Sequence, residues 1–237
     1  MHLSNPTPDM PVANRSRSIP VLRSPMHRLP TPTPWAGSQC RRAQAPTLRL
    51  VTRTLIPGLI GVRDRALLLV GFAGAFRRSE LVSLDVADAT FGADGLIVQL
   101  RRSKTDQEGE GRKVGLPFGS NPLTCPVRAL RAWLDVAVVA RGPIFRAVDR
   151  HGNVAEARLT DQSVALVVKR CAKAAGLDSE KYAGHSLRSG LATAAAMADV
   201  SERAIMAQTG HKSLPMVRRY IRDGSLFRRN AAAAVGL

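Results

Sequence analysis

The chain has 237 residues, of which 45% are hydrophobic, and this is enough to bury the core of one substantial domain. Its formal net charge is +17 and its pI is about 11.4. An excess of positive charge on this scale favours an anionic partner, and nucleic acid is the partner that we expect. A solvated, arginine-rich surface without such a partner is the alternative interpretation.

The cysteines and the apolar segments exclude several classes of protein. Cys40, Cys125 and Cys171 are odd in number and widely spaced, which fits a reducing compartment better than a disulfide framework or a zinc site. The first 18 residues contain no apolar run, so we expect no signal peptide. The longest apolar stretch, residues 66–76, is too short to cross a bilayer. We therefore expect a cytoplasmic protein.

The composition changes near residue 50. Residues 1–50 contain nine of the fifteen prolines and seven arginines against one acidic residue, Asp9, with little hydrophobic periodicity. This composition is typical of a disordered basic tail. We therefore divide the chain into a Pro/Arg-rich tail over 1–50 and a folded domain over 51–237, with ordered structure beginning near Thr52.

The folded part reads as a mainly α-helical α+β domain with a small antiparallel β-sheet. Hydrophobic periodicity and turn signals predict, in chain order, helices at 61–75 and 77–84, strands at 95–103 and 112–118, and helices at 125–140, 160–176, 186–198, 201–210, 213–221 and 225–235. Thr160 and Ser201 are expected to cap their helices, and Gly176 and Gly210 to end them.

An unusual set of polar residues interrupts the alanine-rich helices near the C-terminus. His185 and Arg188 are three residues apart and would share one helix face, and His211 and Tyr220 follow further along. Such groups are costly inside an ordinary core. Each has a simpler interpretation: a surface pair, a residue next to a helix C-cap, and a half-buried tyrosine.

Three further residues belong to the same set. Arg77 and Glu80 are also three apart, so Glu80 can orient Arg77, whereas Arg78 points elsewhere. Lys104 lies in the polar connection between the two predicted strands. Taken singly, these residues would be an ordinary intrahelical ion pair and a solvated lysine.

Together the residue types fit one reaction, attack on a phosphodiester. Two arginines can clamp the phosphate oxygens and cannot lose their protons, so they stabilise the charge that develops. A tyrosine can act as the nucleophile, a histidine can take its proton and a lysine can donate one to the leaving oxygen. This chemistry requires neither a metal nor a cofactor, and we expect neither. A metal-dependent nuclease is disfavoured because no HExxH motif is present.

From about residue 50 onward the chain resembles the tyrosine recombinase (phage integrase) family. The stretches "AGAFRRSEL", "SKT", "HSLR" and "TGHKSLPMVRRY" match that family's motifs in order and spacing. By this resemblance, the catalytic residues are Arg77, Lys104, His185, Arg188, His211 and Tyr220, with Glu80 supporting them. Arg77 and Arg188 would hold the scissile phosphate, and Lys104 would protonate the leaving 5′-hydroxyl. His185 would be the base for Tyr220, and His211 a further hydrogen-bond donor to the phosphate.

The resemblance also implies an activity and partners. A member of this family breaks and rejoins double-stranded DNA through a 3′-phosphotyrosyl intermediate, as a site-specific recombinase or integrase. It works without ATP, in a homo- or hetero-tetramer on DNA, and is associated with the nucleoid. The predicted helix at 225–235 would dock on a neighbouring protomer.

One departure from the family keeps two alternatives open. Family members usually carry a helical core-binding domain ahead of the catalytic domain, and residues 1–50 do not have the composition of one. The chain would then be a truncated or frame-disrupted recombinase, in effect a recombination-defective DNA-binding remnant. The other alternative is a type IB topoisomerase-like nicking and rejoining enzyme, which uses the same chemistry.

Overall fold

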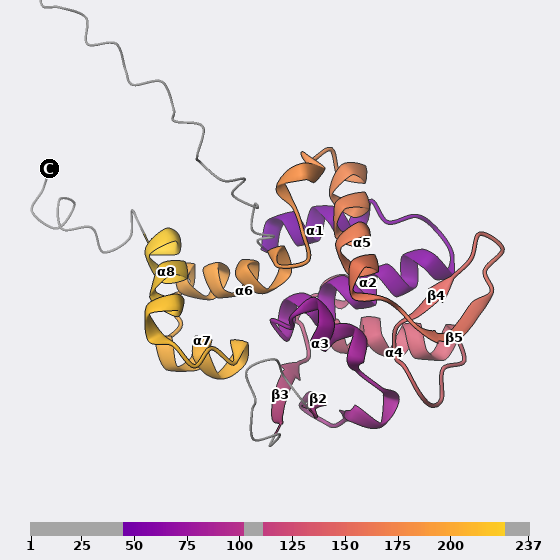
Figure 1. The fold of residues 1–237 in the computed structure, drawn as a ribbon, viewed down its shortest axis with the longest axis horizontal. Helices are drawn as coiled ribbons and strands as arrows, with labels where there is room; N and C mark the ends of the chain where they lie inside the picture. The colour runs from indigo at the N-terminus through magenta and orange to yellow at the C-terminus, as the bar shows by residue number, and fades with distance from the viewer. Residues whose placement is uncertain (1–44, 102–110, 226–237) are drawn as a thin grey trace, which may run out of the picture. The chain divides into compact units, whose positions relative to one another are not determined.

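The computed structural model describes residues 45–101 and 111–225 (Figure 1). The α-helices are α1 (Ala45–Arg53), α2 (Leu59–Ala73), α3 (Arg78–Ser83), α4 (Pro126–Val136), α5 (Asp161–Ala174), α6 (Ser186–Met197), α7 (Glu202–Thr209) and α8 (Leu214–Ser225). The strands are β1 (Ala89–Phe91), β2 (Gly95–Leu100), β3 (Arg112–Pro117), β4 (Arg146–Val148) and β5 (Val154–Arg158). Helices with small antiparallel sheets confirm the predicted fold class.

Two antiparallel sheets accompany the helices. The larger has the order β1-β2-β3, and its central pairing sets Leu96 opposite Leu116 and Val98 opposite Val114. These four side chains are buried because alternate residues of a strand face the same side of the sheet. The register places the first residue of β3, Arg112, on the same inward-facing side as Val114. β4 and β5 form the second sheet, a separate hairpin.

The main hydrophobic core is built around α2, which contacts α1, α4, α5 and α6. Leu67 and Val70 of α2 are fully buried, as is Trp133 of α4. The Trp133 indole N–H also donates a hydrogen bond of 2.8 Å to the carbonyl of Ile144, so its polar atom is satisfied inside the core. Because α2 is enclosed on several sides, the turn that follows it is held in place, and this turn leads to Arg77.

The helices α6, α7 and α8 enclose a second, smaller core. It contains Ala192, Ala196, Ile205 and Val217, with Tyr220 packed against it. The alanines allow close approach, and α8 packs along α6. In Figure 1 these three helices lie together on the left of the described part. This small core brings residues 188, 211 and 220 within reach of one another.

Several predicted boundaries differ from the structure. Structure was expected to begin near Thr52, but the helix α1 already covers Ala45–Arg53 and places Leu48 and Val51 in the main core. The division at residue 50 therefore falls inside a helix. The helix predicted at 125–140 ends at Val136, and Val138 takes a positive φ of 52° that breaks it. The hairpin of β4 and β5 was not predicted, because its exposed strands show no clear alternation of apolar residues.

Other predicted features are confirmed. The Thr160 and Ser201 side chains accept hydrogen bonds from the backbone N–H groups of Ser163 and Ala204. Gly210 adopts the left-handed conformation at the end of α7. The predicted helix at 225–235 lies outside the described residues except for Ser225, the last residue of α8. None of the helices between residues 45 and 101 or 111 and 225 combines the length and apolar character that crossing a bilayer demands.

Candidate active site

Arg77 and Glu80 form the first side of the site. The sequence predicted that Arg77 lies inside a helix. In the structure it is instead the N-cap of α3, with an extended backbone. Glu80 is buried; its Oε2 accepts the backbone N–H of Arg77 at 2.9 Å, and its Oε1 is ion-paired with the Arg77 guanidinium. One carboxylate thus fixes both the backbone and the side chain of Arg77, which an ordinary intrahelical ion pair would not do.

Arg188 of α6 forms the second side. Its side chain is buried, and Nη1 donates a hydrogen bond of 2.7 Å to the carbonyl of Ala75, in the turn between α2 and Arg77. Ala75 has a φ of 49°, a backbone conformation that residues other than glycine rarely adopt. Nη2 of Arg188 is buried, and the part of the chain that the structure describes offers it no hydrogen-bond partner. The turn therefore carries local strain at the point where it receives a buried cation.

His211 is held in one orientation by Thr209. The Thr209 hydroxyl donates to the carbonyl of Ile205 at 2.7 Å, so its oxygen can accept from Nδ1–H of His211, also at 2.7 Å. In this tautomer the neutral ring carries a lone pair on Nε2. Burial, together with the cations Arg188 and Arg77, lowers the pKa of His211 to about 4. The imidazole is therefore neutral at pH 7 in the absence of an anion and cannot use a charge against the helix dipole.

Tyr220 lies next to His211. The two ring centroids are 5.7 Å apart with an interplanar angle of 38°. Tyr220 is half-buried on α8, and its interaction with Arg188 is one of the influences on the Arg188 pKa. Tyr220 thus lies beside His211 and within electrostatic reach of Arg188.

A third arginine, Arg112 of β3, joins the cluster, and sequence reasoning missed it. Its Nη2 lies 3.9 Å from Oε2 of Glu80, and its Nη1 donates a hydrogen bond of 3.0 Å to the carbonyl of Gln208 in α7. Burial lowers the pKa of Arg112, as does Arg77. The alternation of residues along the predicted strand could have indicated Arg112. It shares the inward face of β3 with Val114 and Leu116, where an arginine is unusual.

The cluster carries excess positive charge. Three guanidinium groups, those of Arg77, Arg112 and Arg188, surround the single carboxylate of Glu80, and with His211 neutral two positive charges remain uncompensated. A phosphodiester carries one negative charge, and attack on its phosphorus builds a second. The arrangement is therefore suited to hold a phosphodiester and to stabilise the charge that develops on it.

The neutral state of His211 predicts a pH-dependent stability. An unfolded histidine has a pKa of about 6.5, whereas in the fold the pKa of His211 is about 4. Between these values the unfolded chain binds the extra proton, so stability falls as pH falls through this range. His211 should therefore account for roughly 3 kcal/mol of stability lost between about pH 6.5 and pH 4. Chemical denaturation of wild type and His211→Gln across this range measures the difference in slope.

His151→Gln is the matched control, because His151 is exposed in the turn between β4 and β5. This variant keeps His211, so it should retain the steep pH dependence of the free energy of unfolding that His211→Gln loses. An equally steep dependence in His211→Gln and wild type would show that His211 is not held neutral by its surroundings.

Two predicted site residues remain, His185 and Lys104. His185 is the N-cap of α6 and its side chain is exposed, one helical turn before Arg188. Lys104 lies outside the described residues. The structure therefore brings together Arg77, Glu80, Arg188, His211 and Tyr220. Within the described ranges, no group of three or more His, Cys, Asp or Glu side chains could hold a metal ion.

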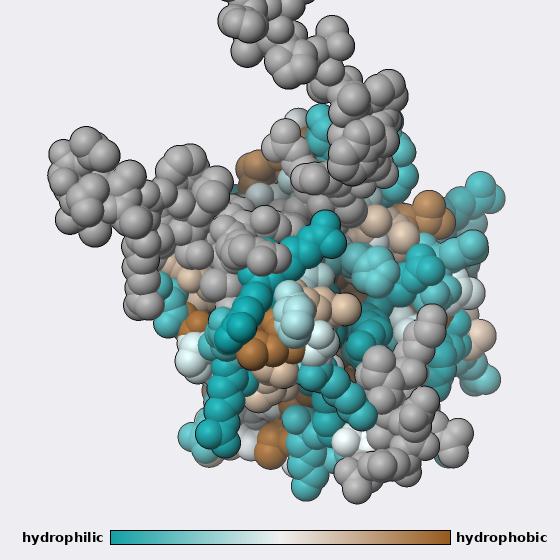
Figure 2. Space-filling model, turned by 60° about the vertical axis from the view of Figure 1, so that its left-hand side comes forward, coloured by the Kyte–Doolittle hydropathy of each residue, from teal (hydrophilic) through white to brown (hydrophobic). Residues whose placement is uncertain are grey.

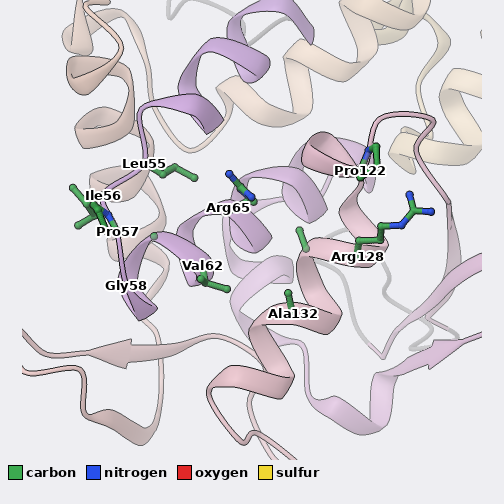
Figure 3. A pocket seen from close by; sticks show the side chains of 11 residues that line it. Leu55, Ile56, Pro57, Gly58, Val62, Arg65, Pro122, Arg128 and Ala132 are labelled. Atoms are coloured by element: carbon green, nitrogen blue, oxygen red, sulfur yellow. The ribbon is translucent and has the colours of Figure 1, made fainter.

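The described cavities lie elsewhere. Figure 3 shows one of about 400 Å³ between the α1–α2 connection, α2 and α4, lined by Leu55, Val62 and Arg128 among others. None of its lining residues belongs to the cluster. The cluster consists of one buried arginine, Arg188, and two half-buried ones, Arg77 and Arg112. The coloured residues on the face drawn in Figure 2 are mainly hydrophilic, with small, separate hydrophobic patches. A site of this kind suits an extended anionic ligand lying on the surface better than an enclosed small molecule.

The fold and the cluster define a class of protein: a mainly helical domain with small antiparallel sheets that gathers three arginines and a histidine beside a tyrosine. The model of the phage integrase family matches residues 43–225. The match covers most of the chain, which therefore belongs to the phage integrase family.

Curated relatives agree with this assignment. An integrase/recombinase xerD homolog from Selenomonas ruminantium is 50% identical over 173 residues, which is 73% of this chain and 51% of the relative. Tyrosine recombinase XerC 1 from Ralstonia nicotianae is 31% identical over 166 residues, or 67% of this chain and 49% of the relative. The chain thus spans about half the length of the curated relatives it matches.

Solved structures share the fold. A XerH site-specific recombinase bound to a palindromic difH substrate, in a post-cleavage complex, has a TM-score of 0.63 at 19% identity and is matched over 84% of this chain and 53% of its own. The XerA recombinase has a TM-score of 0.60 at 19% identity, over 90% of this chain and 69% of its own. Both comparisons support the catalytic-domain fold that the sequence predicted.

Proposed function

We propose that this chain is the catalytic part of a site-specific DNA recombinase, which breaks and rejoins DNA strands through a 3′-phosphotyrosyl intermediate. The observation that carries the proposal is the cluster itself: two uncompensated positive charges from three arginines and Glu80, with the Tyr220 ring 5.7 Å from that of His211. Family membership and relatives named as recombinases support it.

In the proposed reaction, Arg77 and Arg188 hold the non-bridging oxygens of the scissile phosphate. The Tyr220 hydroxyl oxygen attacks phosphorus and loses its proton to His185, while the bond from phosphorus to the 5′-oxygen breaks. Lys104 gives a proton to that departing oxygen. Attack by a 5′-hydroxyl on the phosphotyrosyl bond reverses every step, so a strand is resealed without another energy source.

His211 acts in this scheme only after the phosphate arrives. Because Nδ1–H is already bonded to Thr209, Nε2 must gain a proton before it can donate to a phosphate oxygen. Burial and the arginines lower the pKa of His211, and a bound anion offsets that repulsion and raises it. We therefore expect His211 to take up a proton as the phosphate binds.

Double-stranded DNA is the proposed partner. The net charge of +17 supplies sequence-independent attraction to phosphates. Exposed basic side chains lie on α7, α8 and the turn between them: Arg203, Lys212, Arg218 and Arg219. A XerH site-specific recombinase bound to a palindromic difH substrate and a lambda integrase dimer bound to a COC′ core site share the fold. Assembly as a tetramer on DNA is part of the same proposal.

The test is covalent capture on a nicked duplex that loses a short fragment on cleavage, so that religation is prevented. The full chain should form a protein–DNA adduct with such a substrate carrying its recognition site. DNA binding without any adduct would favour a recombination-defective remnant. Relaxation of supercoiled plasmids of any sequence would favour a topoisomerase-like enzyme.

Arg188 is expected to lower the stability of the folded chain and to raise its rate of adduct formation. Burial, followed by repulsion from Arg77, lowers its pKa to about 10, so the folded chain holds this charge at a cost. Arg188→Met keeps much of the side-chain volume and removes the charge. Adduct formation should fall by about 10²–10³-fold, as for loss of one preorganised donor. Tm should rise, by about 2–4 °C for each kcal/mol gained in a domain of this size.

The control is Arg158→Met, since Arg158 is exposed, pairs with Asp85 and donates to the carbonyls of Val82 and Leu84, which are not cluster residues. That variant should retain wild-type adduct formation and gain no stability. A fall in both activity and Tm for Arg188→Met would show that its hydrogen bond to Ala75 outweighs the repulsion.

A further inference from the structure

Arg112 connects two parts of the cluster that come from distant segments. On one side its Nη2 lies 3.9 Å from Oε2 of Glu80, the carboxylate that orients Arg77. On the other side its Nη1 donates to the carbonyl of Gln208 at 3.0 Å, and Gln208 directly precedes Thr209, the residue that orients His211. A single guanidinium thus spans the distance between the supports of Arg77 and of His211.

The position of Arg112 is unfavourable for an arginine with no role in the site. Nη2 is buried and has no hydrogen-bond partner among the described residues. Val114 and Leu116, on the same face of β3, are buried apolar side chains, so an apolar residue at 112 would continue the pattern without this cost. Packing alone therefore does not explain the charge.

The end of α7 is shaped to receive Arg112. Gly210 has a φ of +66°, and a Cβ atom there would lie 2.8 Å from Nε and 2.9 Å from Cζ of Arg112. Both the backbone conformation and the close approach require glycine. The Gln208 side chain strengthens the same junction, because its amide donates to the carbonyls of Ala73 at 2.7 Å and Gly115 at 3.2 Å. The turn that leads to His211 is therefore fastened to β3 and to the end of α2.

We propose that Arg112 is a positioning residue, which sets the spacing between Arg77 and His211 by holding Glu80 and the end of α7 with one rigid guanidinium. The inference rests on the proposed function, since it is the scissile phosphate that both residues would contact. A lysine at this position keeps the charge but can reach only one of the two partners. The geometry, not the charge alone, is what Arg112 contributes.

The test compares Arg112→Lys and Arg112→Gln in the full chain. Single-turnover adduct formation on the nicked duplex should slow by about 10–100-fold in Arg112→Lys, since small misplacements of catalytic groups have effects of this size. Affinity for the uncleaved duplex should stay at the wild-type level, because DNA binding draws on many other cations. Arg112→Gln should slow the reaction at least as much, and NMR titration should show a raised pKa of the His211 ring, because one repelling cation is gone.

Arg146→Lys is the matched control. Arg146 also opens a strand, β4, and donates to the backbone carbonyls of Pro143 and Arg141, as Arg112 does to those of Ala207 and Gln208. Its partners are not cluster residues. It should retain the wild-type rate. The positioning role is overturned if Arg112→Lys reacts at the wild-type rate, or if its rate and its DNA affinity fall by the same factor.

The two proposals fail in different ways. If the wild-type chain binds DNA but forms no adduct, the proposed function is wrong, and the His211 titration then decides the inference by itself. A His211 pKa that is unchanged in Arg112→Gln would show that Arg112 does not act on this side of the site. A raised pKa in Arg112→Gln, with little change in Arg112→Lys, would support the link even in an inactive chain.

Discussion

Tyr220→Phe is expected to abolish covalent capture of a nicked duplex while leaving DNA binding intact. Phenylalanine keeps the ring that packs on the small core near His211 but lacks the oxygen that would form the phosphotyrosyl bond. The adduct is measured as a band of protein bound to labelled DNA under denaturing conditions. Binding is measured separately by titration of the uncleaved duplex.

The chain contains only two tyrosines, and the other supplies the control. Tyr182 is buried in the main core, whereas Tyr220 packs against the small core. Tyr182→Phe should therefore retain adduct formation. If the adduct persists in Tyr220→Phe and disappears in Tyr182→Phe, Tyr182 is the nucleophile and the proposed site is wrong.

Lys104→Ala is expected to slow cleavage by about 10²–10⁴-fold, the usual range for general acid catalysis. The residue belongs to the connection between β2 and β3, and the described strands end at the pair Leu100 and Arg112. Without a proton donor, the 5′-oxygen must leave as an alkoxide. The measurement is the single-turnover rate of adduct formation.

A substrate with sulfur in the 5′-bridging position separates this role from phosphate binding. A thiolate leaves readily without protonation, so much of the rate lost in Lys104→Ala should return with this substrate. The wild-type rate should change far less. Absence of rescue would assign Lys104 to phosphate binding and would point to Arg102 or Lys113 as the donor.

The local features of this protein were predictable from the sequence. Thr160, Ser201 and Gly210 lie at the helix ends where their chemistry places them, because capping depends on a few neighbouring residues. The two strands of the central hairpin were found from their alternation, which is also local. The ordered motifs identified the family, and the family match over residues 43–225 confirms that identification.

Sequence reasoning was weaker where packing overrides local pattern. The helix α1 has a composition that suggested a tail, yet Leu48 and Val51 lie in the main core. Arg77 was expected inside a helix with Glu80, and instead caps it, since the strained turn at Ala75 redirects the chain. In both cases contacts with distant segments decide the conformation.

Only the tertiary structure decided the electrostatic state of the site. The sequence gives His211 an ordinary pKa, and burial together with Arg188, Arg77 and Arg112 lowers it to about 4. Arg112 lies in the site because β3 and the end of α7 meet at Gly210, although they are nearly a hundred residues apart along the chain. Residue type and spacing determine which groups a chain can offer. Their charge and orientation depend on desolvation and on through-space interactions, which exist only once the segments are packed together.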